Sequence, residues 1–411
     1  MIFKRIRQTL FAPVVVEDKF DAACFNLILF DIFFMPLFPW FSVSISLPIM
    51  LYWYFRRGRF TKYEIEHKFF GIIVILMAIS TMFSVFEFDG ARYNTDFVTS
   101  FKRFMQYITS FMYFFFFQYF FALYRRSITN IIFWGIVYIT IFALIYSFNL
   151  DAFINFKQLV CPFDPQVSRW NEGVLLMYRF NHMWADPNNV AYATVALSIF
   201  YFVEDSTSVI KKYILLICLA YVILCTMSFG GLGVASTLIG YLFLFTNIFR
   251  FDKTTILVGI LFVVLIVLYI LENLEYFTML IDAGFAQRQE IYGNDGMADG
   301  GGRGADFING LSKFNPLFLF VGSGKEGFVT EIGHICIWYM YGFPVYIYFL
   351  YVLFRKRRRQ SLIEYLSTIP LFAGFTMNIA IGEQKYMLLT LLISAFYSAK
   401  YYNLNYQYSV S

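Results

Sequence analysis

The sequence predicts an all-α integral membrane protein with about twelve transmembrane helices. Of its 411 residues, 59% are hydrophobic and 14% are charged, whereas a soluble domain carries about 25% charged residues. The mean hydropathy of +0.62 leaves little sequence for a separate soluble domain. The apolar runs do not alternate with polar residues, which excludes the strands of an outer-membrane barrel. Residues 1–411 are therefore expected to form one polytopic membrane domain.

Each expected span is an apolar run close to the length that a helix needs to cross a bilayer core. The first is expected to be retained, because no small-residue cleavage site follows it. The second is short and lies among prolines, so the first two spans also fit a re-entrant hairpin. The spans are expected at 20–38, 41–55, 68–86, 101–123, 128–149, 186–203, 212–228, 230–249, 254–271, 332–354, 361–379 and 383–399.

The distribution of Lys and Arg predicts that both termini face the cytoplasm, because short cytoplasmic loops carry an excess of basic residues. The short basic segments contain Arg56, Arg57 and Arg59; Arg125 and Arg126; Lys211 and Lys212; and the run 355–359. We interpret the last run as an orientation signal that also contacts lipid headgroups. No stripe of basic and polar residues suggests a nucleic-acid surface.

Two outer segments, 150–185 and 272–331, are much longer than connectors need to be. Loops beyond about 12–15 residues are usually functional or disordered. We expect both to lie on the periplasmic face and to contain short helices. The working site is therefore expected on that face.

Six basic residues lie in these two loops, although the positive-inside bias predicts that basic residues concentrate in cytoplasmic loops. Arginine suits a phosphate or diphosphate, because its planar group donates two hydrogen bonds at once. A cleft between the loops would suit a lipid-linked diphosphate, although each cation could instead be solvated or paired with an acid. The six residues are Arg169 and Arg179 in the first loop, and Arg288, Arg303, Lys313 and Lys325 in the second.

Two of the three histidines, His182 and His334, lie where a long loop meets a span. Histidine is suited to proton transfer near neutral pH, and Glu331 lies one helical turn before His334. Both histidines could instead be interfacial hydrogen-bonding residues. No Cys, His or acidic cluster has metal-ligand spacing, so neither a metal nor another cofactor is expected.

The order of several short motifs in these regions carries a family resemblance. The motif residues are Arg179, Pro187-Asn188 and Ala191; Ser228-Phe229-Gly230-Gly231; and Arg303, Gly322-Ser323-Gly324, His334 and Gly342. Their arrangement resembles that of the Wzy-type O-antigen polymerases and the related O-antigen ligases. Ligases usually have Arg where this chain has Phe229, and Asn where it has Ile335. His182 stands where the family has Gly. The first two departures favour the polymerase side.

The resemblance implies glycosyl transfer between undecaprenyl-diphosphate-linked oligosaccharides at the periplasmic face of a bacterial inner membrane. Arg303, with Arg179 and Arg288, would stabilise the diphosphate leaving group, and His334 beside Glu331 would assist loss of the acceptor proton. Further residues expected to hold diphosphate or glycan are Arg169, Asn188 and His182. The implied partners are the lipid bilayer, a chain-length regulator and a repeat-unit flippase.

Two alternatives remain open. An O-antigen ligase would transfer the glycan to lipid A-core. A lipid-linked oligosaccharide flippase or transporter would need ionisable residues within the spans and repeat symmetry. Asp31 is the clearest acid within a span, and it stands nearly alone.

Overall fold

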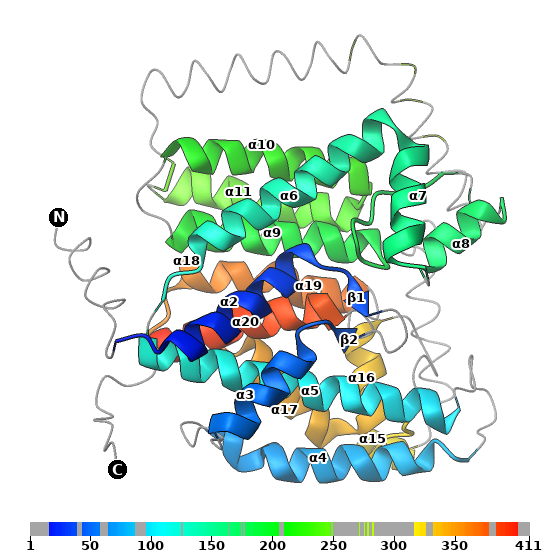
Figure 1. The fold of residues 1–411 in the computed structure, drawn as a ribbon, viewed down its shortest axis with the longest axis vertical. Coiled ribbons are helices and arrows are strands. Elements are labelled where there is room, and N and C mark those ends of the chain that lie inside the picture. The colour runs from blue at the N-terminus through cyan, green and yellow to red at the C-terminus, as the bar shows by residue number, and fades with distance from the viewer. Residues whose placement is uncertain are drawn as a thin grey trace.

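Figure 1 shows the computed structural model of the chain, in which most long helices lie side by side with roughly parallel or antiparallel axes. The structure describes residues 16–38, 43–57, 65–86, 96–124, 126–162, 164–173, 175, 177–204, 209–246, 248–249, 316–325, 332–377 and 384–401, and the single positions 271, 275, 278 and 282.

The described elements are almost all helical, as the sequence predicts. The first half contains α2 (Lys19–Phe34), the strand pair β1 (Leu37–Phe38) and β2 (Val43–Ser44), α3 (Leu47–Arg57), α4 (Ile65–Phe83), α5 (Phe97–Tyr124), α6 (Thr129–Phe148), α7 (Leu150–Val160), α8 (Pro165–Asn171) and α9 (Pro187–Glu204). The second contains α10 (Val209–Thr226), α11 (Phe229–Phe245), α15 (Pro316–Val321), α16 (Gly333–Tyr341), α17 (Phe343–Phe354), α18 (Leu362–Tyr365), η1 (Leu366–Thr368), α19 (Ile369–Met377) and α20 (Gln384–Tyr401).

Two described helices, α6 and α10, are long and apolar enough to cross a membrane. Shorter apolar helices occur at Lys68–Phe83, Phe229–Phe245, Phe343–Phe354 and Leu362–Thr376. The twelve expected spans are therefore matched only in part within the described residues. The run 41–55 overlaps α3, which has 11 residues and ends at Arg57. The expected span 254–271 lies outside the described residues except for position 271.

The expected span 332–354 is not one continuous helix. It is divided into α16 and α17 at Gly342, whose φ of +86° interrupts helical geometry and suits glycine. The ring centroids of Trp338 and Tyr346 are 6.1 Å apart, and those of His334 and Phe354 are 6.2 Å apart. The first pair lies close to Gly342 and the second pair lies further from it on both sides. α17 therefore folds back along α16.

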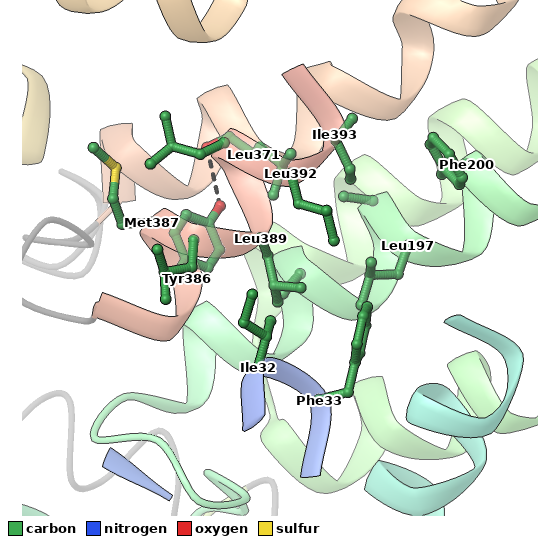
Figure 2. Packing of buried hydrophobic residues seen from close by; sticks show 14 of the residues in the cluster. Ile32, Phe33, Leu197, Phe200, Leu371, Tyr386, Met387, Leu389, Leu392 and Ile393 are labelled. Carbon is green, nitrogen blue, oxygen red and sulfur yellow. Dashed lines mark hydrogen bonds between the residues drawn. The ribbon is translucent and has the colours of Figure 1, made fainter. Parts of the chain in front are cut away.

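The core lies around α9 and α20, which are buried along most of their length. Figure 2 shows Leu197 and Phe200 of α9 facing a row of α20 side chains that includes Leu389, Leu392 and Ile393. In the same view, the Tyr386 hydroxyl of α20 donates a hydrogen bond of 2.9 Å to the Leu371 carbonyl of α19. Helices that are apolar on every face belong in a core rather than at a surface.

A buried ion pair joins the first and last described helices. Lys385 Nζ lies 2.7 Å from Asp31 Oδ1 and also donates to the Asp31 backbone carbonyl at 2.7 Å. The side chains are 0% and 5% exposed. Asp31 Oδ2 accepts hydrogen bonds from the Ser44 hydroxyl and from the Ser46 amide, the latter at 2.9 Å. Asp31, which appears nearly alone in the sequence, thus holds α20 and the β2 segment together.

We predict that Lys385→Met will reduce the free energy of unfolding by about 3–5 kcal/mol, because it leaves the Asp31 carboxylate buried without its cation. Denaturation of the purified protein followed by intrinsic fluorescence measures the change. The double variant Asp31→Leu/Lys385→Met should recover a good part of the loss, because it buries no charge. A double variant as unstable as the single one would show that the ion pair is not responsible.

Candidate functional site

The first long loop contains two short helices, α7 and α8, as expected for 150–185. The Asn149 side chain accepts a hydrogen bond of 2.9 Å from the Ala152 amide and caps α7. Asp164 caps α8 by accepting one of 2.7 Å from the Gln166 amide, and Pro165 occupies the first turn. These polar caps satisfy amides at the start of each helix. In Figure 1 both helices lie on the right-hand side of the molecule.

Lys157 fixes the path of this loop. Its ammonium lies 2.6 Å from Asp164 Oδ2 and donates to the Trp184 carbonyl at 2.9 Å and to the Asn181 side chain. The Lys157 and Asp164 side chains are 1% and 2% exposed. Lys157 was not predicted from sequence, although a lysine seven residues before an acidic helix cap could have suggested the pair. Lys157 therefore orders the loop that contains Arg179.

Arg179 joins motifs that are about 40 residues apart. Its Nε donates to the Thr226 carbonyl at 3.0 Å, and its Nη2 donates to the Met227 carbonyl at 3.2 Å and to Asn188 Oδ1 at 3.3 Å. The Ser228 hydroxyl donates to the same Asn188 oxygen at 2.9 Å. We call the five residues Arg179, Asn188, Thr226, Met227 and Ser228 the motif junction. It brings together two of the sequence motifs on which the family resemblance depends.

Small residues allow α9 and α11 to meet at the motif junction. The Ser228 hydroxyl caps α11 by accepting a hydrogen bond of 3.2 Å from the Gly231 amide. A Cβ atom at Gly231 would lie 2.8 Å from the Ala191 Cβ, closer than two carbon atoms can pack without a shift. The alanine after the Pro-Asn pair and the glycine of the Ser/Gly turn therefore share one close helix contact.

His182 lies in an aromatic enclosure beside the same loop. Its exposed fraction is 3%, and the rings of Tyr138 and Phe142 have centroids 5.5 and 5.4 Å from its own. Its φ of +47° is unusual for a residue other than glycine. Burial, and then the nearby charge of Lys157, lower the pKa of His182 to about 3. The imidazole is therefore neutral near pH 7, so it cannot offer a cation to a diphosphate.

His334 is also buried, near the start of α16. Its exposed fraction is 8%, and its Nε2 lies 3.1 Å from the Phe372 carbonyl of α19. The rings of Phe372 and Phe375 have centroids 4.4 and 5.9 Å from the imidazole. The buried Nδ1 has no hydrogen-bond partner among the described residues. Because Nε2 donates its proton to the Phe372 carbonyl, Nδ1 is the nitrogen of His334 that carries the lone pair and can accept a proton.

The Gly-x-Gly segment before His334 packs the chain tightly between helices. Gly322 and Gly324 have φ of +83° and +70°. The Ser323 and Gly324 amides donate to carbonyls of α16 at 2.8 and 2.9 Å. A Cβ atom at Gly324 would lie 2.1 Å from the Ser80 carbonyl oxygen of α4. These positions require glycine because their φ is positive and because α4 and α16 leave no room for a Cβ atom.

Several predicted site residues cannot be located. Arg288, Arg303, Lys313 and Glu331 lie outside the described residues, as does most of the second long loop. Arg169 is exposed in the last turn of α8, and no hydrogen bond described joins it to the motif junction. Among the described residues, no group of three or more His, Cys, Asp or Glu side chains could hold a metal ion.

No protein-family model matches the chain. No curated protein and no solved structure matches it either. What the chain does is therefore inferred from its own residues and their geometry.

We predict that Gly231→Ala will lower the free energy of unfolding by about 1–3 kcal/mol, because its methyl group overpacks the contact with Ala191. Gly233→Ala is the matched control, since no atom lies within 4 Å of a Cβ built there. Gly233→Ala should raise the free energy of unfolding by up to about 1 kcal/mol, because alanine is favoured over glycine within a helix. Midpoints of thermal unfolding measure both variants. Equal midpoints for the two would contradict the close contact.

We predict that acid will destabilise the protein partly through His182. Its pKa rises from about 3 in the folded state to about 6.5 on unfolding. The stabilising contribution is thus present above pH 6.5 and is lost as the pH falls towards 3. Between pH 7 and pH 5 the loss should be about 2 kcal/mol. In denaturation curves, His182→Phe should lack this part of the pH dependence; an unchanged slope in the variant would argue against a buried neutral imidazole.

Proposed function

We propose that this chain is a multi-spanning membrane glycosyltransferase that polymerises undecaprenyl-diphosphate-linked O-antigen repeat units. The observation that carries the proposal is the motif junction. Arg179 and Asn188 come from one motif of the polymerase pattern and Ser228 comes from another, and hydrogen bonds connect the three residues. A chance sequence likeness would not require these residues to meet.

The distribution of apolar side chains supports a membrane location. Phe148, Ile210, Leu244 and Phe245 are each more than 70% exposed, and they lie on the apolar helices α6, α10 and α11. Charged pairs such as Asp31 and Lys385 are buried instead. Soluble proteins rarely expose apolar surface so widely, whereas lipid is a suitable solvent for it.

The basic residues support the proposed orientation. Arg57 ends α3, and Lys211 lies in the first turn of α10. Because α10 runs from Val209 to Thr226 and Lys211 lies in its first turn, the motif junction lies at the end opposite to this basic residue. By the positive-inside bias, the junction then faces the periplasm, and α7 and α8 lie on the same side.

In the proposed reaction, an acceptor hydroxyl at the non-reducing end of one repeat unit attacks the anomeric carbon of the growing chain. A new glycosidic C–O bond forms as the bond to the lipid diphosphate breaks, and the hydroxyl proton leaves. Arg303 and Arg288 are assigned to the negative charge that develops on the diphosphate. His334 Nδ1, assisted by Glu331, is assigned to the proton.

The sequence suggests that Arg179 contacts the diphosphate, but its hydrogen bonds in the structure indicate a different role. Its guanidinium donates to the carbonyls of Thr226 and Met227 and to Asn188. We therefore assign it as a positioning residue that holds the first loop against the ends of α9 and α10. Asn188 lies beside it at a half-buried position, where its side-chain N–H groups can donate hydrogen bonds to a sugar hydroxyl. The buried Ser228 hydroxyl holds the Asn188 side chain in place.

The ligase alternative uses the same donor and differs in its acceptor. Deletion of the gene in its host distinguishes the two. Loss of a polymerase leaves lipopolysaccharide that carries a single repeat unit, whereas loss of a ligase leaves lipid A-core without any repeat. The transporter alternative is less well supported, because Asp31 is held in a buried ion pair with Lys385.

We predict that the purified chain in vesicles will convert a synthetic undecaprenyl-diphosphate repeat unit into a ladder of oligomers. Arg303→Ala and His334→Ala should each reduce the rate at least about 100-fold. Lys102→Ala, at an exposed position of α5, is the control and should leave the rate unchanged. Gel electrophoresis of released glycan measures the products.

Elution volume and unfolding midpoint establish that each variant is folded. The proposed function fails if folded wild-type protein forms no ladder. It also fails if the two site variants reduce the rate no more than the Lys102 control does.

A further inference from the structure

A groove of about 450 Å³ lies between α17 and the segment formed by α18, η1 and α19. Its lining is largely apolar and includes Ile347, Phe354, Ile369 and Phe372. Ile347 and Phe372 are 45% and 43% exposed, so the groove walls reach the surface of the described structure. Its shape and lining suit a hydrocarbon chain.

One charged residue, Arg355, is among the described residues that line the groove. It directly follows the last residue of α17, and its guanidinium carbon lies 4.1 Å from the centroid of the Tyr351 ring. Arg355 Nη1 also donates to the Tyr351 hydroxyl. The stacking fixes a planar cation at the groove. The groove therefore combines an apolar wall with a held guanidinium.

The surroundings of Arg355 are strongly basic. Lys356, Arg358 and Arg359 follow it and are exposed. The nearby carboxylate of Glu364 is already bound by Lys400 at 2.8 Å and by the capping contact of Ser361. Among the described residues, positive charge consequently dominates this end of the groove. An anionic group complements it, and a guanidinium binds a phosphate through two hydrogen bonds at once.

We propose that the groove binds an anionic phospholipid, with an acyl chain along α17 and α19 and the phosphate on Arg355. Clusters of basic residues next to a membrane helix commonly recognise such headgroups. The proposal rests on the membrane location proposed above but not on glycosyl transfer. It gives the basic run 355–359 a defined lipid site in addition to its part in orientation.

The groove also adjoins the candidate proton acceptor. Phe354 and Phe372 line the groove and contact His334, with ring centroids 6.2 and 4.4 Å from the imidazole. The Phe372 carbonyl is the partner of His334 Nε2. An acyl chain packed against these two rings would restrict their movement. Bound lipid would thus help to hold His334 in position.

Native mass spectrometry of the detergent-purified full chain tests the site. Phosphatidylglycerol and phosphatidylcholine with identical acyl chains are titrated separately. Wild-type protein should retain phosphatidylglycerol about fivefold more strongly, as one basic contact near the headgroup implies. Arg355→Gln should abolish that preference. Arg358→Gln, which neutralises an exposed neighbour that does not line the groove, is the matched control and should keep it.

A second variant tests the apolar part of the site. Ile347→Trp fills the groove from an exposed position and should weaken retention of both lipids. Variants are compared only where elution volume and unfolding midpoint match those of wild type.

Equal retention of the two lipids by wild type, or equal effects of Arg355→Gln and Arg358→Gln, would overturn the proposal. A chain that purifies in solution without detergent would overturn this proposal together with the membrane location, whereas lost lipid selectivity alone would leave the glycosyltransferase proposal intact.

Discussion

The last carbonyls of α10 have no partners within their own helix, and the geometry around the motif junction depends on how they are satisfied. A helix leaves four such groups at its C-terminus. Arg179 donates to those of Thr226 and Met227, which pulls the first loop across the ends of α9 and α10. Lys157 holds the other side of that loop through Asp164. Two cations therefore organise the loop by bonding to protein oxygens, and the small residues Ala191 and Gly231 let the helices below it approach closely.

Composition and the length of the apolar runs were enough to predict a helical chain, because these features depend on local residue patterns. They did not predict where apolar runs would be divided. The run 332–354 reads as one span, yet Gly342 adopts a positive φ and α17 folds back on α16. The cause is tertiary, since a Cβ atom at Gly342 would lie 2.2 Å from the Phe320 carbonyl oxygen of α15. The partner of Asp31 was equally hidden, because Lys385 is 354 residues away in sequence.

In the candidate site, too, residues could be predicted from short sequence motifs, whereas their contacts depend on tertiary packing. Motif order indicated Arg179, Asn188 and the Ser/Gly turn, and the structure connects these residues by hydrogen bonds. It did not reveal that the Arg179 guanidinium bonds to backbone carbonyls, or that His182 is enclosed by aromatic rings. Hydropathy places both residues at a loop boundary, but only three-dimensional packing decides whether a polar group there meets water, ligand or protein. Lys157 was missed for the same reason: its partners are buried with it.

The burial of His334 constrains any mechanism that uses it. An imidazole surrounded by Phe372, Phe375 and Tyr346 cannot reorient freely, and the Phe372 carbonyl fixes one of its nitrogens. Such a group acts well as an acceptor only if the surrounding rings keep the second nitrogen directed at the substrate, because misplacement by about 1 Å can cost two orders of magnitude in rate. Two neighbouring rings, Phe354 and Phe372, form walls of the groove beside Arg355. The position of a candidate catalytic group thus depends on packing in the groove beside Arg355, which is where a bound lipid would act.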